Sequence, residues 1–238
     1  MSYGEFGVFT SSRTTSMNAG LRSYMMRIYN YMSVALGLSG VVAYFAAKSG
    51  LAIAIFTSPI GILVALAPLF MSMYLGFKFH SMTFEKVRSL FFIYSALMGV
   101  SLSSVFLVYT MSDVSLAFFV TASMFGSMSI YGYVTKKDLS AMGSFLIMCV
   151  FGLLIASLAN IFIHSSGMSM AISFMSVLVF SGLTAYDTQK MRDLYYQLNG
   201  SNLNVGKLAV FGAMQLYMDF IAIFVHLLHI IGAMKNDR

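Results

Sequence analysis

The 238-residue chain is too apolar for a water-soluble protein. Its 14 Lys and Arg and eight Asp and Glu make up 9% of the residues, against roughly 25% in soluble domains. Hydrophobic residues make up 59%. This composition excludes a soluble enzyme and a disordered chain, and the single Cys149 excludes a disulfide within the chain.

The polar breaks divide the chain into seven candidate membrane helices, each near or above the roughly 20 residues that cross a bilayer core. We place them near 28–47, 58–77, 89–111, 114–134, 139–163, 168–188 and 208–234. The first apolar run is too long for a signal peptide, so we expect an uncleaved first helix. The sequence thus predicts an all-α polytopic membrane protein, with a polar N-terminal tail over 1–20 and one transmembrane domain over 21–238.

The basic residues predict which way the helices face. With the N-terminus in the cytoplasm, the inside segments contain Arg13, Arg22, Arg27, Lys78, Lys86, Arg88, Lys136, Lys137, Lys190, Arg192 and Lys207. The outside segments contain only Lys48, Lys235 and Arg238. This positive-inside bias places the C-terminus outside, although a six-helix arrangement with a re-entrant last segment would return it to the inside. Because the basic residues are scattered between apolar runs, they do not predict nucleic-acid binding.

Two acidic residues fall inside apolar segments. Asp187 closes the sixth helix and Asp219 lies within the seventh. A charge in hydrocarbon costs at least about 2.5 to 3.5 kcal/mol, so an acid in a membrane helix is by default a functional candidate. Placing the outer end of the last helix near Met234 puts Asp219 about 7.5 Å from the inner boundary, and Asp187 about 4.5 Å from it. Placing its inner end at Lys207 instead would put Asp219 about 18 Å deep and separate the two acids.

The seventh helix carries a polar stripe. Gln215, Asp219, His226 and His229 fall within an arc of about 80° on an otherwise apolar cylinder. Such a stripe requires protein or water beside it, so we expect the other six helices to surround this one. The two histidines are more typical of satisfied interfacial residues than of a metal site, because neither Cys nor acids lie near them in the sequence.

Small residues at four-residue spacing predict where helices approach closely. One such row consists of Ser95, Gly99 and Ser103, and a second consists of Gly152, Ala156 and Asn160. We interpret both rows as helix-packing seams.

Three segments resemble the Bax inhibitor-1 family, and most closely its bacterial inner-membrane members. They are Tyr186-Asp187-Thr188-Gln189, Leu216-Tyr217-Met218-Asp219-Phe220 and Tyr131-Gly132-Tyr133-Val134-Thr135-Lys136-Lys137-Asp138-Leu139. The resemblance covers nearly the whole chain from Arg22. It implies seven helices with a central C-terminal helix wrapped by the other six, a bacterial inner-membrane location, and a pH-sensitive calcium leak controlled by an aspartate pair, here Asp187 and Asp219. The chain departs from the family pattern at Ala222, where a polar Asn is usual, and at His229, where a basic residue is common.

Physical reasoning gives that pair a mechanism. Two neighbouring carboxylates in a low-dielectric site cannot both ionise cheaply, so they share one proton. The protonated pair joins the sixth and seventh helices; loss of the proton leaves a repulsion that water, a Ca²⁺ ion or the Lys78 ammonium relieves. We expect the pair to be the pH sensor and a transient Ca²⁺ ligand, with Tyr186, Gln215, His226, His229 and Lys78 as accessory residues. An inert polar clamp between two helices is the structural alternative.

Two other functions remain open. Some members of the resembled family associate with membrane-bound proteases or cell-death machinery, so a regulatory binding protein is the alternative to transport. An intramembrane aspartyl protease also uses acids on two neighbouring helices, and Tyr186-Asp187 fits its first motif. Asp219 does not fit the second motif, because no Gly-x-Gly-Asp is present. We therefore expect no enzymatic activity and no cofactor, with the lipid bilayer as the main partner.

Overall fold

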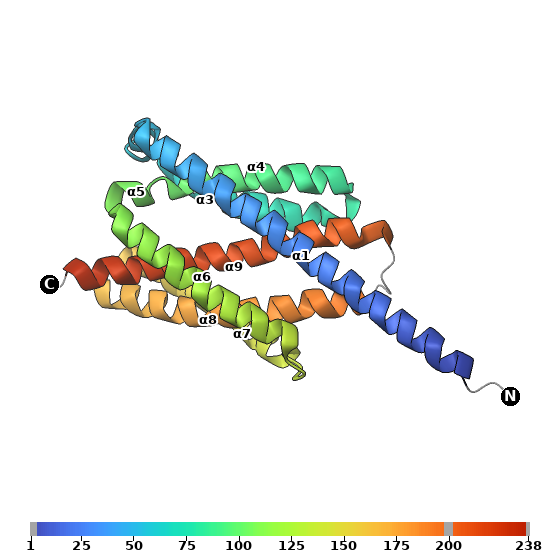
Figure 1. The fold of residues 1–238 in the computed structure, drawn as a ribbon. Coiled ribbons are helices and arrows are strands. Elements are labelled where there is room, and N and C mark those ends of the chain that lie inside the picture. Colours follow the sequence, from blue (N-terminus) through green and yellow to red (C-terminus); the bar gives the residue numbers. More distant parts are fainter. Residues whose placement is uncertain (1–3, 198–201, 237–238) are drawn as a thin grey trace.

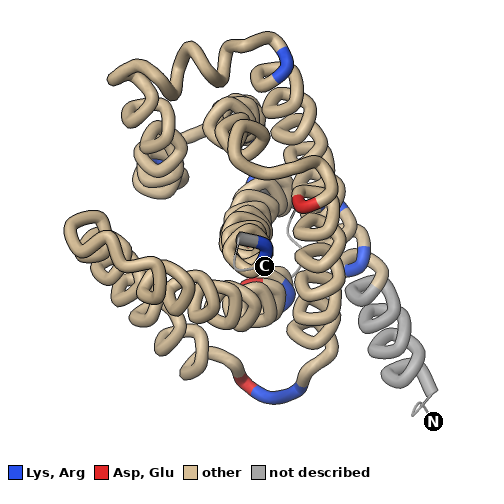
Figure 2. Tube along the Cα trace, turned by 90° about the vertical axis from the view of Figure 1, so that its left-hand side faces the viewer, with Lys and Arg blue, Asp and Glu red and all other residues tan. Residues whose placement is uncertain are grey.

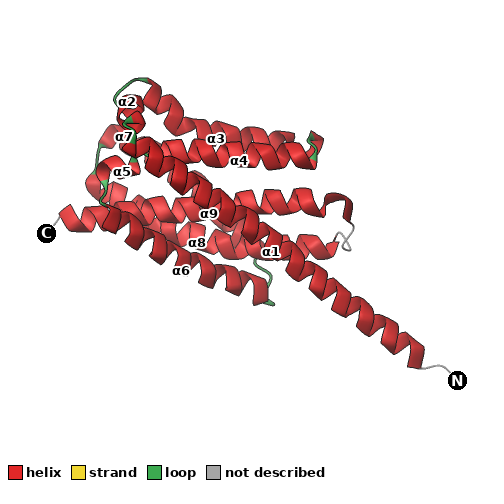
Figure 3. Ribbon diagram, turned by 45° about the horizontal axis from the view of Figure 1, so that its top comes forward, coloured by secondary structure: helices red, strands yellow, loops and turns green. Residues whose placement is uncertain are grey.

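The computed structural model describes residues 4–197 and 202–236, and within these ranges every regular element is helical. Seven helices are long and apolar enough to cross a membrane. They are α1 (Gly4–Lys48), α3 (Ile60–Lys78), α4 (Phe84–Leu102), α6 (Met111–Val134), α7 (Ser140–Ile163), α8 (Ser166–Gln197) and α9 (Asn202–Asn236). The connections contain the short helices α2 (Leu51–Phe56), η1 (Phe79–Ser81) and α5 (Val105–Val108) (Figures 1 and 3). The predicted all-α, seven-helix architecture is confirmed.

Two helices are longer than their apolar runs. The membrane-spanning part of α1 begins at Ala19, and its helix already begins at Gly4, inside the polar tail. Helix α8 continues past the predicted end at 188 to Gln197. Charged residues end an apolar run without ending a helix, because the backbone hydrogen bonds do not depend on side-chain polarity.

The predicted third helix, 89–111, is interrupted. Helix α4 ends at Leu102 and α5 begins at Val105. At the break, Ser103 Oγ donates to Val100 O at 2.6 Å and Ser104 Oγ donates to Ser101 O at 3.0 Å. Serine hydroxyls that bond back to carbonyls of the preceding turn compete with the helical hydrogen bonds, so two consecutive serines favour the interruption.

Helix α9 lies at the centre of the arrangement (Figure 2). It packs most extensively on α8, α1, α6 and α4, whereas α3 packs mainly on α4 and α7 mainly on α8. In its most apolar stretch 67% of the residues are buried, while in that of α7 none is buried. The polar stripe of α9 is therefore shielded from lipid by protein.

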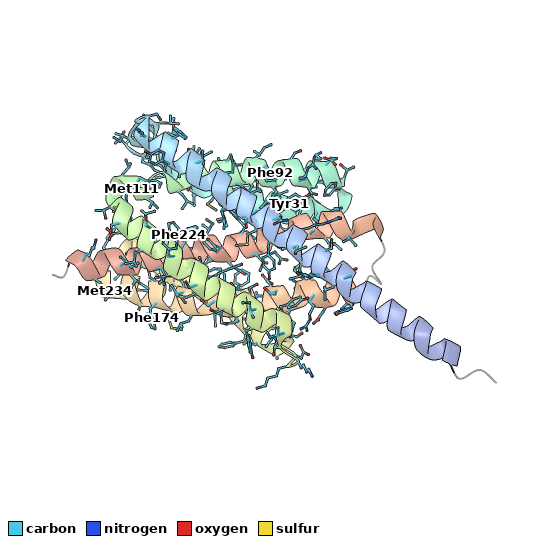
Figure 4. All side chains as sticks on the ribbon, viewed as in Figure 1. Tyr31, Phe92, Met111, Phe174, Phe224 and Met234 are labelled. Atoms are coloured by element: carbon cyan, nitrogen blue, oxygen red, sulfur yellow. The ribbon has the colours of Figure 1, made fainter. Side chains whose placement is uncertain are left out.

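The first small-residue row is a packing seam between α1 and α4. A Cβ on Gly99 would lie 2.7 Å from Ser39 O, and Ser39 Oγ donates to Ser95 O at 2.7 Å. Tyr31 of α1 and Phe92 of α4 also face each other, with ring centroids 6.4 Å apart (Figure 4).

The second predicted seam is wrong at its first residue. Gly152 is exposed, and a Cβ there would meet nothing within 4 Å. Asn160 instead holds the turn between α7 and α8, since its Nδ2 donates to Ser169 Oγ at 2.7 Å and its Oδ1 accepts from Ser165 N at 3.1 Å. Small residues on a lipid-facing helix surface have the same spacing as a seam, so spacing alone did not distinguish them.

Candidate functional site at the interface of α8 and α9

The two acids in the membrane helices are buried in the interface between α8 and α9. Asp187 is 8% exposed and Asp219 is 5% exposed. Helices α8 and α9 pack on each other more extensively than any other pair of helices. The structure therefore places both residues that the sequence singled out in the protein interior, on two helices that pack against each other.

Two side-chain oxygen atoms of α9 lack a hydrogen-bond partner in this part of the bundle. Among the described side chains, Gln215 Oε1 and Asp219 Oδ2 are both buried without a hydrogen-bond partner. Residues four apart lie on one face of a helix, so the two oxygens belong to the same stripe. A buried acceptor without a donor is costly, and such groups in native proteins usually receive a proton, a water or a cation.

The residues around Asp187 fix the rotation of α8 about its axis. Thr188 Oγ1 lies 3.1 Å from Ser129 Oγ of α6. Gln189 binds the loop between α6 and α7 twice, accepting from Leu139 N and donating to Lys137 O, each at 2.8 Å. These contacts on successive residues direct Asp187 toward α9.

Tyr186 packs on the other neighbour of α8. A Cβ on Gly143 of α7 would lie 2.4 Å from the Tyr186 ring, so only glycine leaves room for this ring. Tyr186 thus has a packing role beside the acid pair, as does the segment around Gly132, which lies against the backbone of Ala185.

The sequence suggested Lys78 as the cation near the pair, and Lys78 is exposed at the end of α3. Lys190, which the sequence reasoning did not single out, lies three residues after Asp187 on α8, and its Nζ lies 5.8 Å from the Tyr186 ring centroid. The spacing of three residues on one helix was the available signal, because residues i and i+3 are neighbours on a helix surface.

Sequence reasoning missed the role of Arg192. Its Nη1 donates to Tyr133 O at 2.8 Å and to Thr135 O at 3.0 Å. The guanidinium therefore satisfies the last carbonyls of α6 and connects them to α8. The nearness of this helix end to α8 was not visible in the sequence.

The two histidines of the stripe share one partner. His229 Nδ1 lies 3.0 Å and His226 Nδ1 3.3 Å from Ser173 Oγ of α8. The histidine half of the α9 stripe thus faces α8. Ser173 gave no sequence signal, because buried serines are frequent in membrane helices. Within the described residues, no group of three or more His, Cys, Asp or Glu side chains is arranged to hold a metal ion.

Comparison with known proteins gives one consistent result. A family model described as "Inhibitor of apoptosis-promoting Bax1" matches residues 21–237. The inner membrane protein YbhL of Escherichia coli K12 is 41% identical over 217 residues, covering 90% of this chain and 93% of YbhL. An uncharacterized protein of Rickettsia prowazekii is 40% identical over 228 residues, covering 95% of this chain and 96% of its own. An uncharacterized protein of Caulobacter vibrioides is 39% identical over 233 residues, covering 93% and 92%.

Proposed function

The chain belongs to the Bax inhibitor-1 family, and we propose that it is a pH-sensitive calcium leak pathway of a bacterial inner membrane. The proton shared by Asp187 and Asp219 controls the pathway. The location is carried over from YbhL, which is named an inner membrane protein.

The observation that carries this proposal is the pair of buried side-chain oxygens on α9 that lack a hydrogen-bond donor. Asp219 Oδ2 and Gln215 Oε1 are buried acceptors with no donor among the described side chains, and Asp187 is buried on the adjoining helix α8. Oxygen ligands of this kind are those that Ca²⁺ prefers. A proton or a cation satisfies them, so the two compete for one place.

This competition between a proton and a cation can open and close the pathway. With one proton shared, the two carboxyl groups hold α8 and α9 together at a buried point of their interface. Without it, two negative charges face each other in a low-dielectric site, and their repulsion favours separation of the helices or entry of a cation. Lys190 lies three residues after Asp187 on α8, so its positive charge is near enough on the helix surface to moderate the repulsion.

Further polar groups support a route from the acids toward the histidines. Thr121 Oγ1 and Ser181 Oγ are also buried without a partner among the described side chains. Ser181 lies about 9 Å along α8 from Asp187, and Ser173 lies about 12 Å beyond it. Helix α6, which carries Thr121, packs against both α8 and α9. Unpartnered hydroxyls along this line are available to water or to a passing ion.

Orientation follows from the basic residues. Lys190 and Arg192 follow Asp187 on α8, and Lys136 and Lys137 follow α6 at the same end of the bundle. The positive-inside rule places this end in the cytoplasm. The N-terminus is then cytoplasmic and the C-terminus outside, although Arg238 lies outside the described residues.

Calcium flux into proteoliposomes tests the proposal. Liposomes containing the purified full chain and a trapped calcium indicator should fill faster than empty liposomes, and Asp219→Asn should change the rate. Glu85→Gln is the matched control, because Glu85 is an exposed acid that forms an ion pair with Arg88 on its own helix. No flux from the purified protein, together with a stoichiometric partner in a pull-down, would contradict the proposal and favour the regulatory binding role.

A further inference from the structure

Two apolar hollows with no common lining residue lie between α1 and α6, and together they are called the slot. The smaller part has a volume of about 330 Å³ and is also lined by α4, α5 and α9, and the larger part has a volume of about 580 Å³. The larger part is lined on α1 by Met25 and Met26 and on α6 by Phe125, Gly126 and Ile130. Both hollows are within the size range of small-molecule sites. Because α1 and α6 are membrane helices, hydrocarbon chains surround this slot.

Glycines keep the slot open. A Cβ on Gly126 of α6 would meet nothing within 4 Å, and the same holds for Gly40 of α1 in the smaller part. Most other glycines at helix contacts, such as Gly99 and Gly132, lie against a neighbouring backbone. The free space at Gly126 is therefore not used for helix packing.

The mouth of the larger part carries a cation. Arg22 of α1 lines it together with Tyr133, which belongs to the last turn of α6. Arg22 is exposed, and the three ion pairs among the described residues do not include it. The exposed Lys136 and Lys137 follow Tyr133, while Asp193 nearby on α8 is paired with Arg192 at 2.9 Å. The balance of charge at this mouth is positive.

An apolar slot alone does not select a ligand inside a bilayer. A lipid chain is as apolar in bulk lipid as in the slot, so its entry yields no hydrophobic free energy. Preference for one lipid must come from the head group. A guanidinium at the membrane boundary binds phosphate with two parallel hydrogen bonds and attracts anionic lipids.

We propose that the slot between α1 and α6 binds one anionic phospholipid, with its phosphate on Arg22 and an acyl chain along Gly126. The smaller part of the slot has no charged residue in its lining, so it contributes no head-group preference.

The lipid site adjoins the acid pair through a short chain of hydroxyl groups. Tyr29 and Ser129, which both line the slot, lie 2.5 Å apart. Ser129 in turn lies 3.1 Å from Thr188, the neighbour of Asp187. A bound lipid therefore contacts side chains that position α8, although the binding proposal does not depend on the ion-leak function.

Native mass spectrometry of the delipidated full chain tests the site. Phosphatidylglycerol and phosphatidylcholine with identical acyl chains are the two probes. We expect wild type to bind phosphatidylglycerol about fivefold more tightly, since one cation at a membrane surface contributes roughly 1 kcal/mol to the attraction of anionic lipid. Arg22→Gln should remove this preference and Arg22→Lys should retain most of it. Arg27→Gln is the matched control, because Arg27 is an exposed arginine on the same helix outside the slot.

Two glycine variants test the acyl-chain part of the site. Gly126→Leu should fill the slot and weaken the binding of both lipids. Gly37→Leu, at an exposed and equally open glycine of α1, should weaken the binding of neither lipid. Equal binding of the two lipids by wild type, the same loss in Arg22→Gln and Arg27→Gln, or unchanged binding in Gly126→Leu would each overturn the proposal. If Gly126→Leu does not fold, the two arginine variants decide.

Discussion

Gly132 of α6 lies directly against the carbonyl group of Ala185 on α8. A Cβ on residue 132 would be 2.1 Å from Ala185 O, and any side chain there must push the two helices apart. Ala185 lies two residues before Asp187, so this contact determines how deeply that part of α8 sits in the bundle.

Gly132→Ala should therefore destabilise the protein. Overpacking of a tight contact typically costs about 1 to 3 kcal/mol of stability. Thermal unfolding in detergent, monitored by size-exclusion chromatography, measures this loss of stability. Gly126→Ala is the matched control on the same helix, because a Cβ there meets nothing within 4 Å. Equal midpoints for the two variants would show that the contact is not tight.

Tyr217→Phe should weaken the contact of α9 with α1. The Tyr217 hydroxyl lies 2.6 Å from Ser39 Oγ, which also reaches Ser95 O of α4. Side-chain hydrogen bonds in membrane proteins contribute on average about 0.6 kcal/mol, with a maximum near 1.7. We expect a loss in that range in a denaturant titration. Tyr131→Phe should lose nothing, since Tyr131 is 44% exposed; a similar loss in both would contradict the assignment.

The sequence predicted the seven helices and the importance of Asp187 and Asp219 because apolar length and misplaced charge are properties of single segments. It did not predict Ser173 as the shared partner of two histidines, or the contact of Arg192 with the end of α6. Those relationships depend on the rotation of α8, which is set by contacts with the loop before α7 and with α6. The sequence also did not predict the helix break at Ser103. The apolar run continues through this position, whereas the break depends on serine hydroxyls that bond to carbonyls of the preceding turn.

Thr121→Val should separate stability from transport. Its hydroxyl is buried without a partner among the described residues, and an unpaired buried hydroxyl costs roughly 1 to 3 kcal/mol. The isosteric change should leave stability equal or increased. If the hydroxyl lines the ion route, calcium flux should fall in the same variant. Ser123→Ala, at an exposed position of α6, should change neither; unchanged flux in Thr121→Val would remove Thr121 from the route.

Asp138 should make stability depend on pH at the acid end. Hydrogen bonds from Ser140 lower the pKa of the Asp138 carboxyl below 3.8, and Ser140 N donates to Asp138 Oδ1 at 2.8 Å. A carboxyl group whose pKa is lower in the folded than in the unfolded protein stabilises the folded state. This stabilisation is complete above the unfolded-state pKa of about 4, and it is lost as the pH falls through the folded-state pKa.

Asp138→Asn should accordingly remove this component. Unfolding midpoints measured between about pH 6 and pH 3 should fall less steeply in the variant than in wild type. Parallel curves for the two proteins would show that the Ser140 hydrogen bonds do not act through the charge of Asp138.

Calcium flux as a function of pH, in proteoliposomes of wild type, Asp187→Asn and Asp219→Asn, is the most direct measurement of the shared-proton gate. Asn keeps the shape of Asp but cannot take up or release the proton. We predict a pH-dependent rate for wild type and a pH-independent rate for each variant, with all three proteins folded. A rate that follows pH equally in wild type and both variants would contradict control by the aspartate pair.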